Sequence, residues 1–201
     1  MIGLFANEPF DFEPGAGYRY NNSGYYLLGV IISKVTGMPY REYLEKKLLA
    51  PLGLEQSLFC DVARLVRNQA QGYEMEDGKL VNEAPIDMNV PGPAGAICST
   101  VLDLLEWNRA LHGGRVVSAG SLAKMTTGQV KSGESSEYGY GLGIARLDGH
   151  RQVAHSGGIN GFNSWLATYP DDSLTVVVLT NNREGRAVQL GQMLARLILS
   201  R

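Results

Sequence analysis

Cysteine and histidine are scarce, with two cysteines and three histidines in the chain. Cys60 and Cys98 do not form a Cys-x-x-Cys pair, no two histidines are four residues apart, and no His-x-Glu occurs. These absences argue against a zinc site, and we expect neither a metal nor a cofactor. Two isolated cysteines favour buried thiols over a disulfide.

Long apolar runs and strong charge are also missing. No run approaches the roughly 20 apolar residues that cross a bilayer, so no membrane span is expected. The formal net charge of −2 comes without a basic stripe, which argues against a nucleic-acid partner. The first five residues lack the features of a signal peptide. We expect a soluble chain whose compartment stays open, since any signal would lie upstream.

The composition instead indicates an ordered globular chain. Its 201 residues, 44% of them apolar, suit one domain. Residues 1 to about 130 are predicted to be a helical region, and residues from about 135 to 201 a sheet with a C-terminal helix. Because helices precede strands rather than alternating with them, the predicted class is α+β, with an antiparallel sheet packed with helices.

In the first half, two helices are predicted. Ser23 is expected to cap a helix over residues 24–36, which is apolar on nearly every face and should be deeply buried. Gly37 should end it. A second helix is expected over residues 40–50. Residues 54–96, rich in proline and glycine, are predicted to be a long loop.

In the second half, helices are predicted over about 100–112 and 118–127. Four strands should follow, with the last two forming an antiparallel hairpin: residues 138–147, 152–156, 163–169 and 173–180. A final helix over about 186–199 carries one apolar stripe that we expect to pack on the sheet: Leu190, Met193, Leu194, Leu197 and Ile198.

The first candidate site residues are Tyr20 and Asn22, which end a glycine-rich loop just before the predicted helix. A tyrosine here can act as a general base if a nearby cation lowers its pKa. Asn22 can hold a lysine or a substrate amide through its side-chain amide. Alternatively, Tyr20 packs and Asn22 bonds turn backbone.

The second candidate stretch is His155-Ser156-Gly157-Gly158. Its small residues, Ser156 and Gly157, allow a substrate backbone to approach the strand edge closely. His155 can offer a proton or a positive charge to a developing anion, and the Gly158 N–H can donate to an oxyanion. The alternative is that His155 is an ordinary surface or core residue.

Together, four blocks in order closely resemble the serine β-lactamase and penicillin-binding family, in the branch of class C β-lactamases, D-Ala-D-Ala carboxypeptidases and related esterases. The resemblance runs from about residue 4 to 199, and its blocks include Tyr20-Asn21-Asn22, Ala94-Gly95-Ala96, Tyr138-Gly139-Tyr140-Gly141 and His155-Ser156-Gly157-Gly158. It implies a β-lactamase/transpeptidase-like fold. His155 replaces the Lys of the family's Lys-Thr-Gly.

The resemblance also implies roles. The family nucleophile lies in a Ser-x-x-Lys motif well upstream of Tyr-x-Asn, but residues 1–19 contain no serine. The chain is therefore expected to be truncated at its N-terminus, without the nucleophile segment. Tyr20, with the missing Lys, would shuttle the proton. Asn22 would orient that Lys and the substrate, Gly158 would hold the oxyanion, and His155 would contact a substrate carboxylate or assist Tyr20.

Two other serines are rejected as nucleophiles. Ser121-Leu122-Ala123-Lys124 matches Ser-x-x-Lys but follows Tyr20, reversing the family order, and a helix N-terminus with an exposed lysine explains it. Ser156 cannot pair with His155 in a triad because adjacent strand residues point to opposite faces.

The predicted function is that of a β-lactamase-related serine hydrolase acting on a small ester, amide or β-lactam. His155 in place of Lys lowers the charge at neutral pH, which favours an esterase or peptidase over an efficient β-lactamase. Alone, the chain should be nearly inactive. It should also associate with itself through an exposed apolar seam. The alternative is a non-catalytic remnant that binds a peptide or cell-wall fragment.

Overall fold

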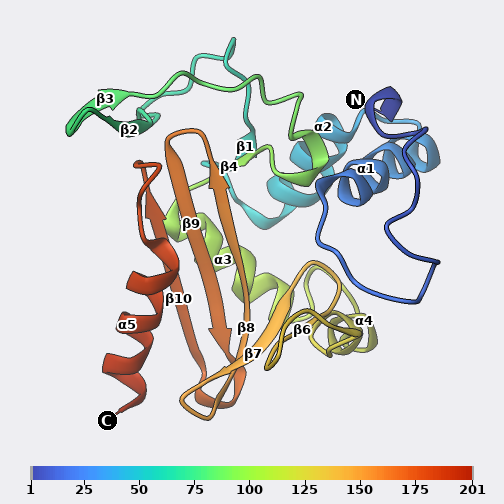
Figure 1. Ribbon diagram of the computed structural model, residues 1–201, viewed down its shortest axis with the longest axis vertical. Coiled ribbons are helices and arrows are strands. Elements are labelled where there is room, and N and C mark those ends of the chain that lie inside the picture. Colours follow the sequence, from blue (N-terminus) through green and yellow to red (C-terminus); the bar gives the residue numbers. More distant parts are fainter. Residues whose placement is uncertain (1, 201) are drawn as a thin grey trace. The chain divides into compact units, whose positions relative to one another are not determined.

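The computed structural model describes residues 2–200 and divides into two compact units (Figure 1). The first unit comprises Met1–Leu65 and Ile86–Asp103, and the second comprises Val66–Pro85 and Leu104–Arg201. Within residues 2–200, no helix is both long and apolar enough to span a membrane.

The first unit is mainly helical. Its helices are η1 (Ile2–Leu4), α1 (Asn22–Thr36), α2 (Tyr40–Tyr43), the π-helix η2 (Leu44–Leu49), and the 3-10 helices η3 (Ala50–Leu52) and η4 (Gly92–Ala94). A two-stranded antiparallel pair, β1 (Leu58–Phe59) and β4 (Ile97–Cys98), completes it. The helix predicted over 40–50 is present, as the continuous run from α2 to η3.

Helix α1 begins two residues earlier than predicted. Asn21 is its N-cap, with extended backbone and a side chain that accepts a hydrogen bond from Gly24 N at 2.8 Å, so the assignment of Ser23 as cap was wrong. Gly37 ends the helix with φ of 67°, as predicted, because glycine adopts the left-handed conformation without steric cost.

The prediction that α1 is deeply buried was wrong. Gly29 is its buried residue, and a Cβ there would lie 2.1 Å from Pro93 Cγ. The helix therefore packs on η4 through its glycine face. The larger side chains point elsewhere, with Leu28, Ile31 and Val35 50%, 54% and 81% exposed.

The two cysteines form a disulfide, which corrects the prediction of two buried thiols. Pairing of β1 with β4 sets Leu58 opposite Cys98, and the next residue after β1, Cys60, donates its N–H to Ala96 O at 2.8 Å. This brings the two cysteine Cα atoms to 5.3 Å, inside the range that a disulfide bridges. Cysteine spacing in the sequence carries no sign of this pairing.

The second unit is built on a six-stranded sheet in which every neighbouring pair is antiparallel, as predicted. The strand order is β10-β9-β8-β7-β6-β5. The strands are β5 (Val130–Lys131), β6 (Glu137–Tyr138), β7 (Gly143–Leu147), β8 (His150–Ile159), β9 (Phe162–Tyr169) and β10 (Leu174–Thr180). The predicted final hairpin is β9–β10, joined by the 3-10 helix η5 (Pro170–Asp172).

Two strand predictions need correction. The strand predicted over 138–147 is divided between β6 and β7, because Gly139 and Gly141 form a turn in which Gly139 N donates to Leu142 O. The loop predicted over 54–96 contains a hairpin of β2 (Tyr73–Glu76) and β3 (Lys79–Asn82). Its turn is Asp77-Gly78 with positive φ at both residues, a recognised hairpin signal that we overlooked.

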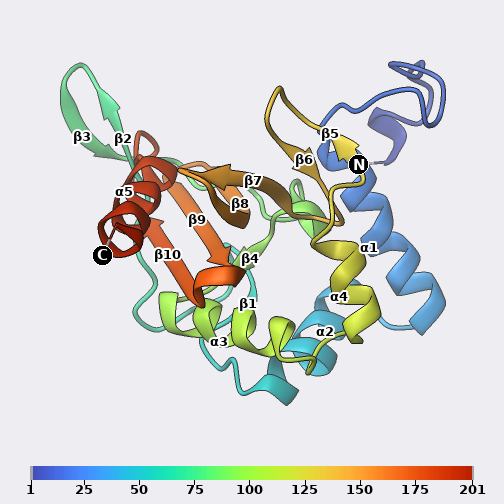
Figure 2. The same cartoon turned by 90° about the horizontal axis from the view of Figure 1, so that it is seen from below.

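Helices α3 (Val101–His112) and α5 (Ala187–Leu199) lie on opposite faces of the sheet, and α4 (Ala119–Met125) precedes β5 (Figure 2). Buried Asn108 ties α3 to the sheet. It accepts from Thr168 Oγ1 at 2.9 Å and donates to Thr175 Oγ1 at 3.0 Å. These bonds satisfy polar groups that would otherwise be costly to bury.

Helix α5 packs on the sheet by a different face from the one predicted. Its buried residues are Ala187, Gly191 and Ala195, spaced four apart, and they join the core around Trp165. The predicted stripe is instead 45% to 63% exposed at Leu190, Met193, Leu194, Leu197 and Ile198. The small residues permit close approach to a bulky tryptophan, whereas the sequence pattern marks only where the large apolar side chains lie.

Candidate acyl-transfer site

Tyr20 belongs to the first unit and lies two residues before the first residue of α1. Its side chain is 51% exposed. Partial burial, together with the neighbouring Tyr25, raises the pKa of the Tyr20 hydroxyl. A base role requires a lowered pKa, which neither partial burial nor Tyr25 provides.

Asn22 is the first residue of α1 and is exposed. Its neighbour Asn21 supplies the helix cap, and Asn21 also donates from Nδ2 to Arg19 O at 3.2 Å. The turn-bonding role considered for Asn22 thus falls to Asn21. The Asn22 amide stays at the surface, at the start of a well-formed helix.

The stretch from His155 to Gly158 lies in the second half of β8. Pairing of β7 with β8 ends at Gly143 opposite Ala154, whereas β8 continues beside β9 to Ile159 opposite Phe162. Among residues 2–200, no strand pairs with the other side of β8 beyond Ala154. This part of β8 is therefore an open strand edge, and substrate approach at Ser156 and Gly157 stays a prediction.

The register shows which backbone groups face the open edge. Asn160-Gly161 is a two-residue turn between paired Ile159 and Phe162, so that pair bonds inward to β9. Antiparallel pairs alternate between hydrogen-bonded and non-bonded, so Gly158 and Ser156 direct their N–H and C=O groups away from β9. The Gly158 N–H therefore points into the open edge, which is the orientation an oxyanion donor needs.

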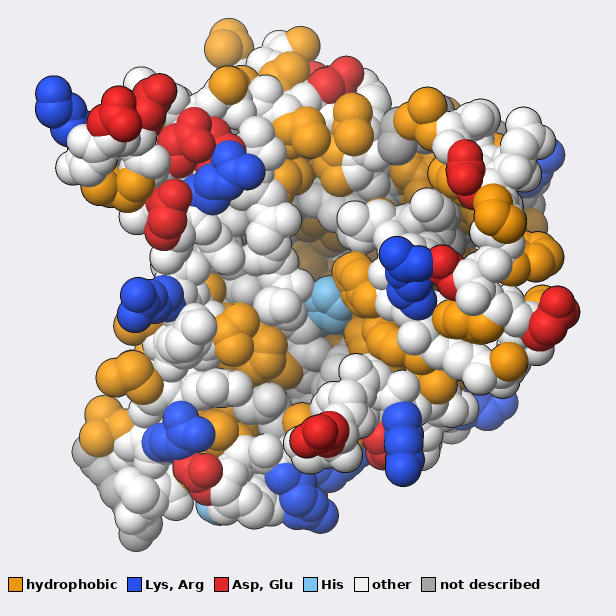
Figure 3. All heavy atoms as spheres, viewed as in Figure 1, with side chains coloured by type: hydrophobic (Ala, Val, Ile, Leu, Met, Phe, Trp, Pro, Cys, Tyr) orange, Lys and Arg blue, Asp and Glu red, His pale blue; other side chains and the backbone are white. Residues whose placement is uncertain are grey.

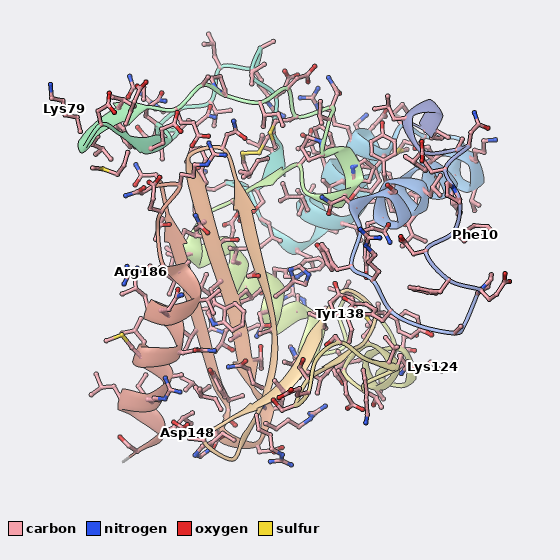
Figure 4. All side chains as sticks on the ribbon, in the orientation of Figure 1. Phe10, Lys79, Lys124, Tyr138, Asp148 and Arg186 are labelled. Carbon is pink, nitrogen blue, oxygen red and sulfur yellow. A yellow bond between two sulfur atoms is a disulfide. The ribbon has the colours of Figure 1, made fainter. Side chains whose placement is uncertain are left out.

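His155 is held by two polar contacts within the same unit. Tyr138, which lies in β6 (Figure 4), places its Oη 3.0 Å from His155 Nε2. The two ring planes meet at 73°. On the other side of the ring, Nδ1 lies 2.6 Å from the Ser156 carbonyl oxygen. His155 is thus an oriented residue at the open edge rather than an unconstrained surface histidine.

A buried carboxylate, which our sequence reasoning missed, fixes the turn that ends β8. Glu83 accepts from Gly161 N at 2.5 Å and pairs with Arg183 Nη1 at 2.5 Å, with its own side chain 2% exposed. Gly161 has φ of 75°, and a Cβ there would lie 2.6 Å from Gly72 Cα. The segment before β2 therefore packs directly against the turn at Gly161. These contacts hold the end of β8, the strand that carries Gly158, in place.

Ser121 has the surroundings of a helix start. Ser118 caps α4 by accepting from Ser121 N at 3.2 Å, and its hydroxyl donates to Ser121 Oγ at 3.1 Å. Lys124 is exposed. The interpretation of Ser121-Leu122-Ala123-Lys124 as a helix N-terminus with a solvated lysine agrees with this geometry.

The described residues also contain no group of three or more His, Cys, Asp or Glu side chains placed to hold a metal ion. The candidate side chains described above offer a phenol, an amide and an imidazole, and the edge of β8 offers backbone N–H donors. Groups of these kinds are suited to proton transfer and to oxyanion stabilisation.

Comparison with known proteins identifies the family. The family model described as Beta-lactamase matches residues 1–200. Penicillin-binding protein 4* of Bacillus subtilis is 28% identical over 92% of this chain and 44% of its own length, and the D-aminopeptidase of Gluconobacter oxydans is 26% identical over 92% and 35%. The octameric penicillin-binding protein homologue from Pyrococcus abyssi superimposes with a TM-score of 0.86, at 31% identity over 94% of this chain and 44% of that one.

The chain belongs to the β-lactamase family, and its fold is that of the penicillin-binding and β-lactamase proteins. It spans less than half the length of the relatives named above. The resemblance first detected in four sequence blocks is therefore confirmed at the level of family and fold.

Proposed function

We propose that this chain supplies the downstream part of a serine acyl-transfer site, whose nucleophile belongs to a Ser-x-x-Lys segment not found among residues 1–19. The observation that carries the proposal is the open edge of β8, where the Gly158 N–H faces outward on the strand that also bears His155. Membership of the β-lactamase family supports the reaction class.

In the proposed reaction, the serine oxygen attacks a carbonyl carbon while its proton passes to Tyr20 and the lysine of the missing motif. The carbonyl oxygen becomes an oxyanion that accepts from Gly158 N–H and from the nucleophile's own N–H. When the tetrahedral intermediate collapses, the leaving group takes the proton and the acyl group stays on serine. Water then releases the acyl group by the same steps. Asn22 orients the lysine and the substrate amide.

The proposed substrates are small esters or amides, with β-lactams less favoured. The relatives include penicillin-binding proteins and a D-aminopeptidase. A lysine in the position of His155 would carry a full charge for a substrate carboxylate, whereas an imidazole is partly neutral at pH 7. Ser156 would contact the bound acyl chain through its backbone groups at the open edge. Gly157, which has no side chain, would leave room for that acyl chain.

The experiment restores the missing part. A family member's Ser-x-x-Lys segment is fused upstream of Met1, and labelling by a fluorophosphonate is followed by mass spectrometry, after a cooperative melt has shown that the fusion is folded. We expect an adduct on the grafted serine. Tyr20→Phe should slow labelling by roughly 100-fold or more, because general-base catalysis contributes on that scale.

Tyr18→Phe is the matched control, since Tyr18 is another tyrosine of the same loop and has no proposed role. A folded fusion that is not labelled, or equal labelling of the Tyr18 and Tyr20 variants, would refute the proposed chemistry. If the fusion binds a peptide or cell-wall fragment but is never acylated, the chain is instead a non-catalytic remnant.

We also expect the chain to associate with itself. Helix α5 exposes five large apolar side chains, and apolar atoms cluster along this edge of the second unit (Figure 3). Exposed apolar stripes of this kind mark association surfaces, and the Pyrococcus abyssi homologue is octameric. Light scattering should therefore give a mass above the 21.8 kDa of one chain. The double variant Leu194→Lys with Leu197→Lys should lower the measured mass to that of one chain. Leu65→Lys is the control, and a monodisperse wild-type monomer would contradict this prediction.

A further inference from the structure

The Tyr138–His155 pair lies beside the open edge of β8. The reaction proposed above gives no role to Tyr138. Tyr138 is the last residue of β6 and is paired with Gly143, the first residue of β7. Gly143 is in turn paired with Ala154, which precedes His155. The two side chains therefore meet where the β7 pairing ends, and there Tyr138 Oη lies 3.0 Å from His155 Nε2.

The contact on the other side of the ring determines the tautomer. A backbone carbonyl oxygen can only accept, so the 2.6 Å contact between His155 Nδ1 and Ser156 O places a proton on Nδ1. In the neutral ring the proton is then absent from Nε2, which accepts from the Tyr138 hydroxyl. When the ring is protonated, Nε2–H donates and Tyr138 Oη accepts. A hydroxyl can satisfy both states because it is donor and acceptor at once.

We propose that Tyr138 is a positioning residue that holds His155 in the Nδ1-protonated tautomer with a fixed ring plane. This inference rests on the proposed function for its purpose, since it defines what His155 can offer a substrate. In the neutral ring, Nε2 accepts from the Tyr138 hydroxyl, so this contact sets the direction in which the Nε2 lone pair points. In the proposed reaction the base is Tyr20, and His155 acts as an oriented polar or charged group beside the Gly158 donor.

The test is the imidazole nitrogen spectrum of the full 201-residue chain, recorded by long-range ¹⁵N–¹H NMR. With three histidines in the chain, the spectrum is assigned by single substitution. We expect His155 to show a protonated Nδ1 and an unprotonated, hydrogen-bonded Nε2. In Tyr138→Phe, the Nε2 signal should move away from its wild-type position because the phenol donor is lost, while the signals of His112 and His150 stay in place.

Tyr140→Phe is the matched control, since Tyr140 is a neighbouring tyrosine with 59% exposure, and it should leave the His155 signals unchanged. A proton on Nε2 in the neutral wild-type ring, or an Nε2 signal that ignores Tyr138→Phe, would overturn the proposal. The NMR result does not depend on catalysis, so it separates this inference from the proposed function. In the acylable fusion, Tyr138→Phe should lower kcat/KM by about tenfold, the scale of one hydrogen bond to a charged group.

Discussion

Gly191→Ala should destabilise the second unit, although alanine is the better helix former. A Cβ at this position would lie 2.2 Å from Trp165 Cδ1 and 2.9 Å from Trp165 Nε1. Trp165 is 8% exposed and belongs to the core, so its ring has little room to move. Overpacking of this kind costs about 1–3 kcal/mol, against about 0.5–1 kcal/mol gained from helix propensity. We expect a net loss, measured as a lower urea midpoint.

Gly120→Ala provides the matched control for this substitution. Gly120 is also helical, in α4, but a Cβ there would have no atom within 4 Å. It should therefore leave stability unchanged or raise it by roughly 0.5–1 kcal/mol. If both alanine variants were equally stabilising, α5 would not pack on Trp165 as described.

Removing the disulfide should have a still larger effect, in the first unit. Cys60 and Cys98 are 38 residues apart, and the loop-closure model predicts a loss of about 4 kcal/mol for a loop of that length. Cys60→Ala with Cys98→Ala should lower the urea midpoint of unfolding, followed by far-UV circular dichroism. Alkylation of the denatured, unreduced wild-type chain should find no free thiol.

Chemical reduction is the control for the cysteine substitutions. The reduced wild-type chain should unfold near the midpoint of the double variant, and reduction should not change the double variant. Two alkylated thiols in the unreduced wild-type chain would contradict the disulfide and restore the original interpretation of two buried thiols.

The sequence predicted those features of the fold that depend on local pattern. The antiparallel sheet, the Gly37 helix end and the α+β class follow from period, turn residues and element order. The buried faces of α1 and α5 could not be predicted in this way, because small residues such as glycine and alanine do not stand out in a hydrophobic pattern. Close approach to Pro93 or Trp165 becomes apparent only when the partner surface is in place.

In the candidate site, too, local pattern could be predicted from the sequence and tertiary contacts could not. Small residues next to His155 led us to predict a strand edge there, and β8 includes both His155 and Gly158. The catalytic roles of the two residues stay a prediction. Glu83 and Tyr138 were not predicted as supports, since their contacts span 78 and 17 residues along the chain. A contact formed by tertiary folding leaves no local spacing to recognise. The disulfide was missed for the same reason.

The most direct test of the central claim is intact mass spectrometry of the 201-residue chain after incubation with a fluorescent penicillin and with a fluorophosphonate, alongside Ser121→Ala. We predict no adduct on either protein, because Ser121 lies at an ordinary helix start and residues 1–19 contain no serine. An adduct that disappears in Ser121→Ala would make Ser121 the nucleophile, and would contradict the claim that this chain holds only the downstream part of the site.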